Sequence, residues 1–380
     1  MRILYLFRSL AVWGGIERVF VDKMNGLSSL HGIEIFLLTT DQGQHPIPYL
    51  LNSQINVEDL GICFYHKYRY HLLNRLFVSY KMKCRYEQLL SDRLKKISPD
   101  VIVCTTSDHI DTIVKLKGSV PLIVESHSIC IRTIEQGKWW MLRKIYRQRF
   151  LHAISKADVV IALTEKDALE WRKYHPLVKV IPNMVHTEEG LPSKLESKHA
   201  IFVGRFDYQK RVQDAIMIWK EVSKIYPDWV LDIYGEGDLE DEISAMASGM
   251  ENILIHKPTH EIFKCYRESS FLIVTSLFEP FGLVLVEAMS CGLPVVAFDC
   301  PYGPAEILTH GKNGYLINSR DQKAFVEKIC CLINNPTSRS RMGHAAICAS
   351  YKYLPLNILP IWKRLFNELL SNHAGVSMPE

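Results

Sequence analysis

The sequence has no long hydrophobic run. None of its apolar stretches approaches the roughly 18 uninterrupted residues that a membrane-spanning helix requires. The apolar run at residues 3–7 is followed at once by Arg8, is too short for a signal peptide and lacks a small-residue cleavage site. We therefore expect a cytoplasmic protein whose contact with a membrane, if it has one, is peripheral.

The sequence also has little with which to bind a metal or build disulfides. Its ten cysteines are scattered, none forms a C-x-x-C pair, and Cys330 and Cys331 are adjacent, a spacing that does not easily close a bridge. This pattern favours reduced, mostly buried thiols and predicts no metal site. The formal net charge of +4 is too small to argue for nucleic acid, although it suits an anionic small ligand or an acidic membrane surface.

The chain of 380 residues is too long for a single hydrophobic core, so two domains are expected. In the first half, short apolar runs alternate with amphipathic segments. The predicted strands are residues 3–7, 34–39, 101–104, 122–125 and 159–163, and the predicted helices are residues 16–30, 76–97 and 139–156. Buried strands that alternate with helices indicate a parallel sheet covered on both faces.

The alternation breaks near residue 190 and then restarts. In the second half the predicted strands are residues 200–203, 229–234, 253–256, 272–275 and 294–298, and the predicted helices are residues 212–225, 239–246, 262–269, 283–291 and 322–334. We therefore predict a first α/β domain at residues 1–190, a linker at 191–198 and a second, doubly wound domain at 199–355. The C-terminal segment, 356–380, is predicted to form a helix that packs back on the first domain.

Glycines and cations follow the first strand of each predicted domain. In the first domain Gly14 and Gly15 precede a helix, so a phosphate could approach the backbone and the free N–H groups there. In the second domain Gly204 is followed by Arg205, Lys210 and a further arginine, and such side chains grip phosphate. A plain glycine turn and a solvated basic loop are the alternatives.

Two glutamates lie eight residues apart around a predicted helix start. Glu279 precedes the helix, and Phe281, Gly282 and Leu283 begin it, so their N–H groups form an anion site. Glu287 lies on an otherwise apolar helix, where a carboxylate is costly unless it is paired or bonded to hydroxyls. The alternatives are a buried salt bridge for Glu287 and an exposed loop acid for Glu279.

Three further segments follow predicted strands and are weaker candidates. Gly235 lies in a glycine turn that could pass close to a nucleotide, and Lys257 and Pro258 could contact a base through their backbone. His127, after a strand of the first domain, could bond a sugar hydroxyl or the reacting group, although a lone histidine is usually structural.

Taken in order, these motifs resemble family 4 glycosyltransferases of the GT-B fold. The resemblance spans almost the whole chain, is strongest at residues 200–317 and is weak at 42–96. The segments that carry it are residues 14–18 (Gly-Gly-Ile-Glu-Arg), Gly204-Arg205 with Lys210, residues 234–237 (Tyr-Gly-Glu-Gly), the E-x7-E motif from Glu279 to Glu287, residues 301–307 (Pro-Tyr-Gly-Pro-Ala-Glu-Ile) and residues 311–315 (Gly-Lys-Asn-Gly-Tyr). One departure is Arg211, where the family often has glycine after the lysine.

The resemblance implies a fold and an activity. It implies two Rossmann-like, doubly wound domains facing a central cleft, with the acceptor bound by the first and a nucleotide-sugar by the second. The implied reaction is retaining transfer of a hexose or N-acetylhexosamine, without a metal or other cofactor.

The resemblance also assigns roles to single residues. Arg205 and Lys210 would hold the diphosphate, with the amide of Gly15 beside a phosphate. Glu287 would bond the ribose, while Glu279 and the amides of Phe281 and Gly282 hold the transferred sugar and its phosphate, and His127 lies near that sugar.

The acceptor and the exact donor are less closely defined. UDP is favoured over GDP or ADP. Residues 65–96 and 138–150 are basic and aromatic, which suits an anionic membrane interface and a lipid-linked or lipopolysaccharide glycan acceptor in bacterial surface polysaccharide synthesis, although a solvated face is equally compatible. The alternatives to a transferase are a catalytically silent nucleotide-sugar-binding partner of a glycan assembly complex, an epimerase or a phosphorylase.

Overall fold

The computed structural model describes residues 1–135, 140–188 and 190–373, and these form two compact units. The first unit contains Met1–Met184 and the chain from Ile358 onward, and the second contains Val185–Asn357. The second unit thus begins before the predicted linker. The reason lies in its hydrogen bonds: Val185 N donates to Tyr353 O, and Ser193 N donates to Cys291 O, so this segment is part of the second unit. Residues 136–139, 189 and 374–380, on which parts of the predicted helices and of the first domain fall, lie outside the described residues.

The first unit is built on a parallel sheet of seven strands in the order β3-β2-β1-β4-β5-β6-β7. Its strands are β1 (Arg2–Phe7), β2 (Glu34–Thr39), β3 (Asn56–Asp59), β4 (Val101–Thr105), β5 (Leu122–Glu125), β6 (Val159–Ala162) and β7 (Val178–Val180). Its helices are α1 (Gly15–Ser28), η1 (Phe64–Arg69), α2 (Leu72–Ile97), α3 (Ile110–Leu116), α4 (Cys130–Ile134), α5 (Trp140–Ile154) and α6 (Glu165–Trp171). The strand order reverses beside β1, which is where doubly wound sheets bind ligands.

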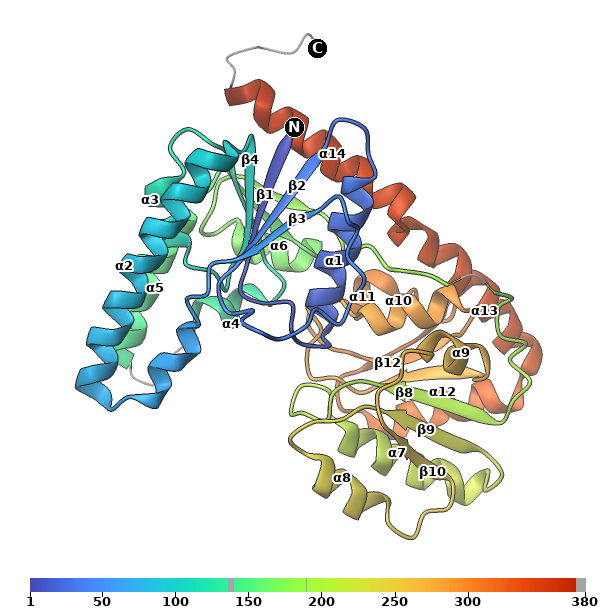
Figure 1. Cartoon of the computed structure of the whole chain (residues 1–380). Coiled ribbons are helices and arrows are strands. Elements are labelled where there is room, and N and C mark those ends of the chain that lie inside the picture. Colours follow the sequence, from blue (N-terminus) through green and yellow to red (C-terminus); the bar gives the residue numbers. More distant parts are fainter. Residues whose placement is uncertain (136–139, 189, 374–380) are drawn as a thin grey trace. The chain divides into compact units, whose positions relative to one another are not determined.

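Helices cover both faces of this sheet. Successive strand residues point to opposite sides, so both faces carry apolar side chains that pack against helices. One face, with Ile3, Tyr5 and Val103, packs against α1 and against the C-terminal helix α14 (Pro355–His373). The other face, with Leu4 and Ile102, packs against the helices between β3 and β7 (Figure 1). From Ile358 on, α14 therefore contributes to the core of the first unit.

The second unit repeats the design with six parallel strands in the order β10-β9-β8-β11-β12-β13. Its strands are β8 (His199–Val203), β9 (Val230–Tyr234), β10 (Ile253–His256), β11 (Phe271–Val274), β12 (Val295–Asp299) and β13 (Gly314–Asn318). Its helices are α7 (Val212–Ile225), α8 (Glu240–Ala247), α9 (Ile262–Arg267), α10 (Leu283–Ser290), α11 (Pro304–Ile307), α12 (Gln322–Asn334), α13 (Pro336–Ser350) and η2 (Tyr351–Tyr353). The predicted pair of doubly wound α/β domains is confirmed.

Several elements, mostly short, were not predicted from the sequence, and β3, β13 and α13 show the physical reasons. The β3 segment is polar, because it forms the edge of its sheet and its residues are only partly buried. The β13 strand begins at Gly314, and glycine is depleted in strands. A β-carbon at Gly314 would stand 2.3 Å from Val295 O, so glycine is needed for the close approach of the two strands. The α13 helix has no regular apolar stripe.

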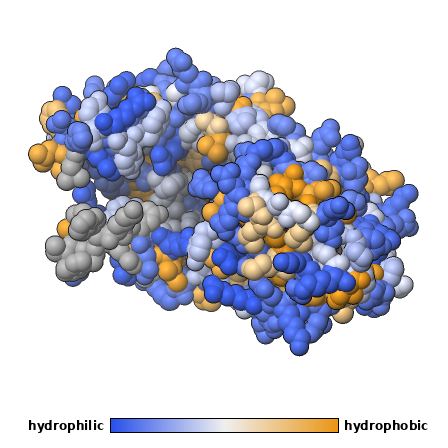
Figure 2. Space-filling view, turned by 90° about the horizontal axis from the view of Figure 1, so that it is seen from below, coloured by the Kyte–Doolittle hydropathy of each residue, from blue (hydrophilic) through white to orange (hydrophobic). Residues whose placement is uncertain are grey.

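Among residues 1–135, 140–188 and 190–373, no helix is both long and apolar enough to cross a membrane. Figure 2 shows hydrophobic side chains interspersed with hydrophilic ones on the face seen from below.

Candidate active site

Two loops at the carboxyl edge of the second sheet are joined by hydrogen bonds. One follows β8 and the other follows β11. Leu277 N donates to Gln209 O at 2.8 Å, and Gln209 Nε2 donates to Phe278 O at 3.1 Å. Thr275 Oγ1 donates to the carbonyl oxygen of Arg211 at 2.8 Å. These bonds bring the basic loop and the two-glutamate motif together, as their positions after parallel strands predicted.

An ion pair joins the same two loops. Lys210 Nζ lies 2.6 Å from Glu279 Oε1, and Ser276 Oγ donates to the same oxygen at 2.6 Å. The side chains of Lys210 and Glu279 are only 14% and 4% exposed, so Glu279 is not an exposed loop acid. Partial burial strengthens the attraction between the two charges, which holds the Lys210 ammonium at a defined place beside the start of α10.

The two arginines of the basic loop have different partners. Arg205 is largely exposed and its Nη2 lies 3.0 Å from Asp207 Oδ2. Arg211 is held by both oxygens of Asp214, with Nε to Oδ2 at 3.0 Å and Nη2 to Oδ1 at 2.9 Å. The Asp214 hydrogen bonds raise the pKa of Arg211 despite partial burial. The extra cation next to Lys210 is therefore engaged by Asp214 at the start of α7, and its predicted binding of phosphate stays a prediction.

The start of α10 has the geometry of an anion site. Gly282 precedes Leu283 with a φ of 102°, a left-handed conformation that favours glycine. Phe281 is buried and packs edge-on against Tyr353 at a centroid distance of 5.2 Å. The first N–H groups of a helix have no partner within it, so this helix start can donate to a phosphate.

Glu287 lies one helical turn further along α10 and is 8% exposed. Tyr266 Oη, from α9, donates to Glu287 Oε2 at 3.3 Å. The carboxylate thus has a hydroxyl partner within the unit. Its burial on an apolar helix is consistent with a role in bonding hydroxyl groups.

The glycine turn after β9 has a packing explanation. A β-carbon on Gly235 would stand 2.0 Å from Gly204 O, and one on Gly237 would stand 2.6 Å from Phe206 O. Phe206 N donates to Glu236 O at 2.8 Å. The glycines therefore let this turn approach the basic loop and hold it in place, whether or not a nucleotide also passes them.

Lys257 and Pro258 follow β10 at the same edge of the sheet. Both are exposed, and Lys257 Nζ is paired with Glu240 from α8. The Glu240 hydrogen bond raises the pKa of Lys257. Their predicted contact with a base stays a prediction.

In the first unit, Gly15 begins α1, as predicted. A β-carbon on the preceding Gly14 would stand 2.3 Å from Glu17 Oε2, so the Glu17 carboxylate lies beside this helix start. Tyr49 Oη donates to Gly14 O at 2.6 Å, and burial raises the pKa of Tyr49 to about 12. A phosphate at Gly15 would compete with the Glu17 carboxylate.

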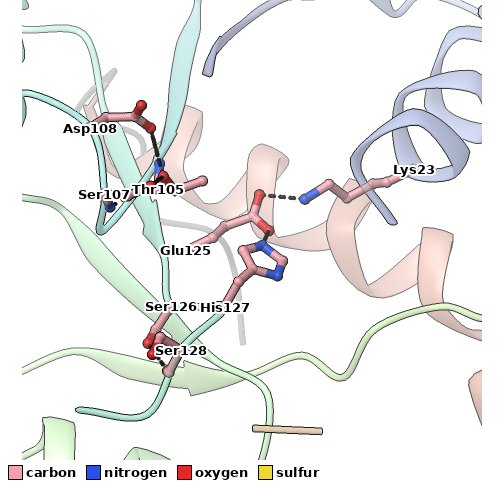
Figure 3. A network of polar contacts seen from close by, with 8 residues as sticks. All are labelled: Lys23, Thr105, Ser107, Asp108, Glu125, Ser126, His127 and Ser128. Atoms are coloured by element: carbon pink, nitrogen blue, oxygen red, sulfur yellow. Dashed lines mark hydrogen bonds and ion pairs between the residues drawn. The ribbon is translucent and has the colours of Figure 1, made fainter. Parts of the chain in front are cut away.

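His127 follows β5 and belongs to a buried polar network (Figure 3). Its Nε2 lies 3.0 Å from Glu125 Oε2, and Lys23, from α1, pairs with the other oxygen of Glu125. Figure 3 shows the His127 ring and the Lys23 ammonium pointing to the same carboxylate. His127 is thus an oriented side chain with a defined partner.

A second carboxyl lies near this network, at the end of β4. Asp108 Oδ2 accepts hydrogen bonds from Thr105 N at 2.6 Å and from Thr105 Oγ1 at 2.8 Å (Figure 3). Burial raises the pKa of Asp108 to about 7, although these hydrogen bonds oppose the shift. Asp108 was not among the residues predicted from the sequence.

A cavity of about 320 Å³ lies elsewhere in the second unit, at the C-terminal end of α10 beside Arg267 and Cys291. None of the predicted site residues lines it. In the described part of the chain, no group of three or more His, Cys, Asp or Glu side chains is arranged to hold a metal ion.

The second unit therefore brings Arg205, Lys210, Glu279 and the α10 start together at one sheet edge. Ser276, Tyr266 and Lys23 were missed at the level of the sequence. For Lys23 there was a signal, because it interrupts an apolar stripe of α1 formed by Phe20, Met24 and Leu27.

Comparisons with known proteins agree with this architecture. A family model described as "Glycosyltransferase Family 4" matches residues 13–189, and one described as "Glycosyl transferases group 1" matches residues 187–347. The two matches together cover nearly the whole of both units.

Relatives and solved structures extend this similarity over the full chain. The amylovoran biosynthesis glycosyltransferase AmsD of Erwinia amylovora is 25% identical, over 96% of this chain and 99% of its own. The crystal structure of a mutant of S. aureus TarM in complex with fondaparinux, alpha-GlcNAc-glycerol and UDP has a TM-score of 0.76 at 18% identity, covering 96% of this chain and 99% of that one. The apo form of the lipopolysaccharide outer core galactosyltransferase WaaB has a TM-score of 0.72 at 18% identity, covering 97% and 100%.

The two family models define a glycosyltransferase, and its fold has two Rossmann-like domains. The chain belongs to family 4 of the glycosyltransferases, with the GT-B fold.

Proposed function

We propose that this glycosyltransferase transfers a hexose or N-acetylhexosamine from a nucleoside diphosphate sugar, with retention of configuration, to a lipid-linked or lipopolysaccharide glycan in bacterial surface polysaccharide synthesis. The observation that carries the proposal is the Lys210–Glu279 ion pair at the start of α10. One cation, one carboxylate and the N–H groups of a helix start therefore lie together there.

This arrangement suits departure of a nucleoside diphosphate. As the bond to the sugar breaks, negative charge grows on the phosphate oxygens. Lys210, Arg205 and the N–H groups of the α10 start offer positive partners at the same sheet edge, and loss of one such group typically costs on the order of 3 kcal/mol in barrier. The proposal needs no metal, since these groups can stabilise the negative charge on the phosphate oxygens.

The proposed roles of the two glutamates differ. Glu279 holds hydroxyl groups of the transferred sugar while its ionic partner, Lys210, turns to the phosphate. Glu287, buried one turn into α10, bonds the ribose of the nucleotide. We favour UDP, and the presence of UDP in the TarM mutant complex, a protein of the same fold, supports this choice.

The proposed acceptor is amphiphilic because of a surface on the first unit. Leu73, Leu76, Phe77 and Tyr80 are exposed and lie at the spacing of one helix face on α2. Cations lie beside aromatic rings there: Arg75 is 4.2 Å from the ring centroid of Tyr68 and Lys81 is 4.5 Å from that of Phe77.

The basic aromatic surface consists of Tyr68, Leu73, Arg75, Leu76, Phe77, Tyr80 and Lys81. A helix face that exposes apolar residues flanked by cations suits the boundary of an anionic membrane. Peripheral contact at the cytoplasmic face of the inner membrane would bring the enzyme to a lipid-linked acceptor. The names of AmsD and WaaB, which mention amylovoran and lipopolysaccharide outer core, are consistent with this acceptor class.

The donor part is tested by incubating the protein with a panel of UDP-, GDP- and ADP-sugars and measuring release of the nucleoside diphosphate. We expect one UDP-sugar to be turned over, and Lys210→Ala and Glu279→Ala to reduce its turnover at least a hundredfold. Lys198→Ala is the control, since Lys198 pairs with Asp228 at the opposite edge of the same sheet. Unchanged turnover in both site variants would favour a silent nucleotide-sugar-binding protein, and sugar conversion without transfer would favour an epimerase.

The acceptor part is tested by flotation with liposomes that contain anionic lipid at low salt. We expect the protein to bind, and Phe77→Ser with Tyr80→Ser to release it. Leu50→Ser, which changes another exposed apolar residue of the first unit, should leave binding intact. The proposal fails if the protein ignores such liposomes and glycosylates only soluble acceptors.

A further inference from the structure

A buried lysine lies in the apolar core of the first unit. The Lys23 side chain is 2% exposed and is surrounded by aromatic faces: its Nζ lies 4.3 Å from the ring centroid of Trp362, 4.5 Å from that of Phe20 and 5.3 Å from that of Tyr5. Aromatic faces stabilise a cation. Burial nevertheless lowers the pKa of Lys23, and Glu125 opposes that shift.

Glu125 is the ionic partner of this lysine. Its side chain is 2% exposed at the end of β5, and Lys23 Nζ donates to its Oε1. Burial by itself would raise the pKa of the Glu125 carboxyl, but the Lys23 ammonium and the hydrogen bond from His127 outweigh it and hold the pKa below its usual value. Glu125 is therefore a carboxylate, which accepts hydrogen bonds and donates none.

The carboxylate determines which nitrogen of His127 carries a proton. His127 Nε2 lies 3.0 Å from Glu125 Oε2, so Nε2 must be the donor. Lys23 and Glu125 already balance one another, and a second proton on the buried ring would leave an unpaired positive charge, which is costly. The ring is therefore neutral, with a lone pair on Nδ1.

The other ring nitrogen of His127, Nδ1, is available to a ligand. His127 is 8% exposed, and its Nδ1 has no hydrogen-bond partner among the described residues. The ring packs at a centroid distance of 5.0 Å against Phe20, which also lies beside Lys23. A buried acceptor without a partner costs free energy, so its retention points to a ligand group that satisfies it.

We infer that Lys23 and Glu125 are positioning residues that hold His127 as the neutral Nε2–H tautomer, so that Nδ1 accepts a hydrogen bond from a hydroxyl of the transferred sugar. The identity of that ligand rests on the proposed function, whereas the tautomer does not. The lone pair on Nδ1 favours a sugar with a hydroxyl at the contacted position and disfavours one with a carboxylate there, because two acceptors repel. Trp362 joins the C-terminal helix to this arrangement through Lys23.

The tautomer is measured by ¹⁵N NMR of the full-length protein labelled at histidine ring nitrogens, at pH 7. The ring signals of His127 are assigned from their loss in His127→Gln, since the chain contains 15 histidines. We expect a protonated Nε2 and an unprotonated Nδ1. A protonated Nδ1, or protons on both nitrogens, would overturn the inference.

Variants separate positioning from mere packing. In Lys23→Met the buried Glu125 loses its cation and takes up a proton, so its O–H donates to Nε2 and the Nδ1–H tautomer should become the major form. Lys23→Met with Glu125→Gln removes both charges at similar volume and should give a mixture of tautomers, which keeps the test available if the single variant does not fold. Lys117→Met is the control, because Lys117 pairs with Asp158 at the other edge of the sheet. An unchanged tautomer in the folded Lys23 variants would refute the positioning role.

The ligand is tested on the same signals. UDP-glucose or UDP-N-acetylglucosamine should shift the Nδ1 signal in the direction of hydrogen bonding, and UDP alone should not. Calorimetry in parallel shows whether the UDP-sugar binds. If neither UDP-sugar binds, the proposed donor is wrong while the tautomer result stands; if one binds and leaves Nδ1 unmoved, the sugar-hydroxyl contact is wrong.

Discussion

A β-carbon on Gly303 would stand 1.7 Å from the carbonyl oxygen of Phe281. The close approach is held by hydrogen bonds, because Gly303 N and Tyr302 N both donate to the carbonyl oxygen of Glu279, at 2.8 and 3.0 Å. The loop after β12 thus supports, backbone to backbone, the segment that leads into α10. Glycine at residue 303 is as necessary to the candidate active site as the glutamates themselves.

Gly303→Ala should therefore reduce donor turnover at least tenfold and destabilise the second unit by about 1–3 kcal/mol, the usual cost of overpacking. The cause is displacement of the Glu279–Phe281 backbone, and both effects are measured by nucleotide-release kinetics and urea denaturation. Gly249→Ala is the control: Gly249 has a positive φ, but a β-carbon there would meet no atom within 4 Å outside its own chain neighbours. It should cost only about 1 kcal/mol of backbone strain and leave turnover unchanged.

Glu287→Gln should raise the KM for the donor about tenfold with little change in kcat. An anchor for the ribose binds the ground state and the transition state equally, so its loss appears in KM. Tyr266→Phe, which removes the hydroxyl that donates to Glu287 Oε2, should have a smaller effect in the same direction. A fall in thermal stability with unchanged KM would instead assign Glu287 a structural role.

Arg205→Gln and Arg211→Gln should separate the two arginines of the basic loop. Arg205 is exposed and held by one aspartate contact, so it can turn to a phosphate, and its loss should reduce kcat/KM about a hundredfold. Arg211 is held by both oxygens of Asp214, so its loss should reduce the free energy of unfolding and leave kcat/KM within about twofold. Equal effects of the two changes on kcat/KM would contradict this assignment.

Asp108→Asn should stabilise the protein more at pH 8 than at pH 5. Burial raises the pKa of Asp108 from 3.8 to about 7. Between those values the folded state retains a proton that the unfolded state has lost, so the contribution of Asp108 to stability falls as pH rises through this window. From pH 5 to pH 8, the unfolding free energy of Asp108→Asn should rise by about 1 kcal/mol or more relative to that of the wild type. One pKa unit corresponds to about 1.4 kcal/mol.

Asp111→Asn is the matched control for this pH dependence. Burial of Asp111 is outweighed by Lys83, which lowers the pKa of Asp111 below 3.8. Ionised Asp111 therefore stabilises the folded state fully at any pH well above 3.8, so Asp111→Asn should destabilise the protein equally at pH 5 and pH 8. Urea denaturation at both pH values decides both cases.

The elements that bear the site could be predicted from the sequence because each has a strong local signal. Continuous apolar runs predict buried parallel strands, and the residues after them meet at one sheet edge. The Arg205 loop and the Glu279 motif were placed together on this basis, and their hydrogen bonds in the structure agree. The full set of ordered motifs made the family recognisable where any single motif was weak.

The unpredicted parts depend on partners far away in the sequence. Lys23 interrupts an apolar stripe, but nothing local reveals that Glu125 balances its charge or that Trp362 lies over it. The start of the second unit at Val185 depends on a hydrogen bond to Tyr353. Such contacts follow from the assembled fold and have no counterpart in local periodicity.

The C-terminal helix also has a consequence for how the chain assembles during synthesis. The core of the first unit contains Ile358, Trp362 and Phe366, so part of one face of its sheet stays uncovered until α14 has been made. The second unit, Val185–Asn357, is by then complete in sequence and can fold without waiting. The order of completion is thus the reverse of the order of synthesis, and a chain that is released after Asn357 should have a folded second domain and an unfolded first one.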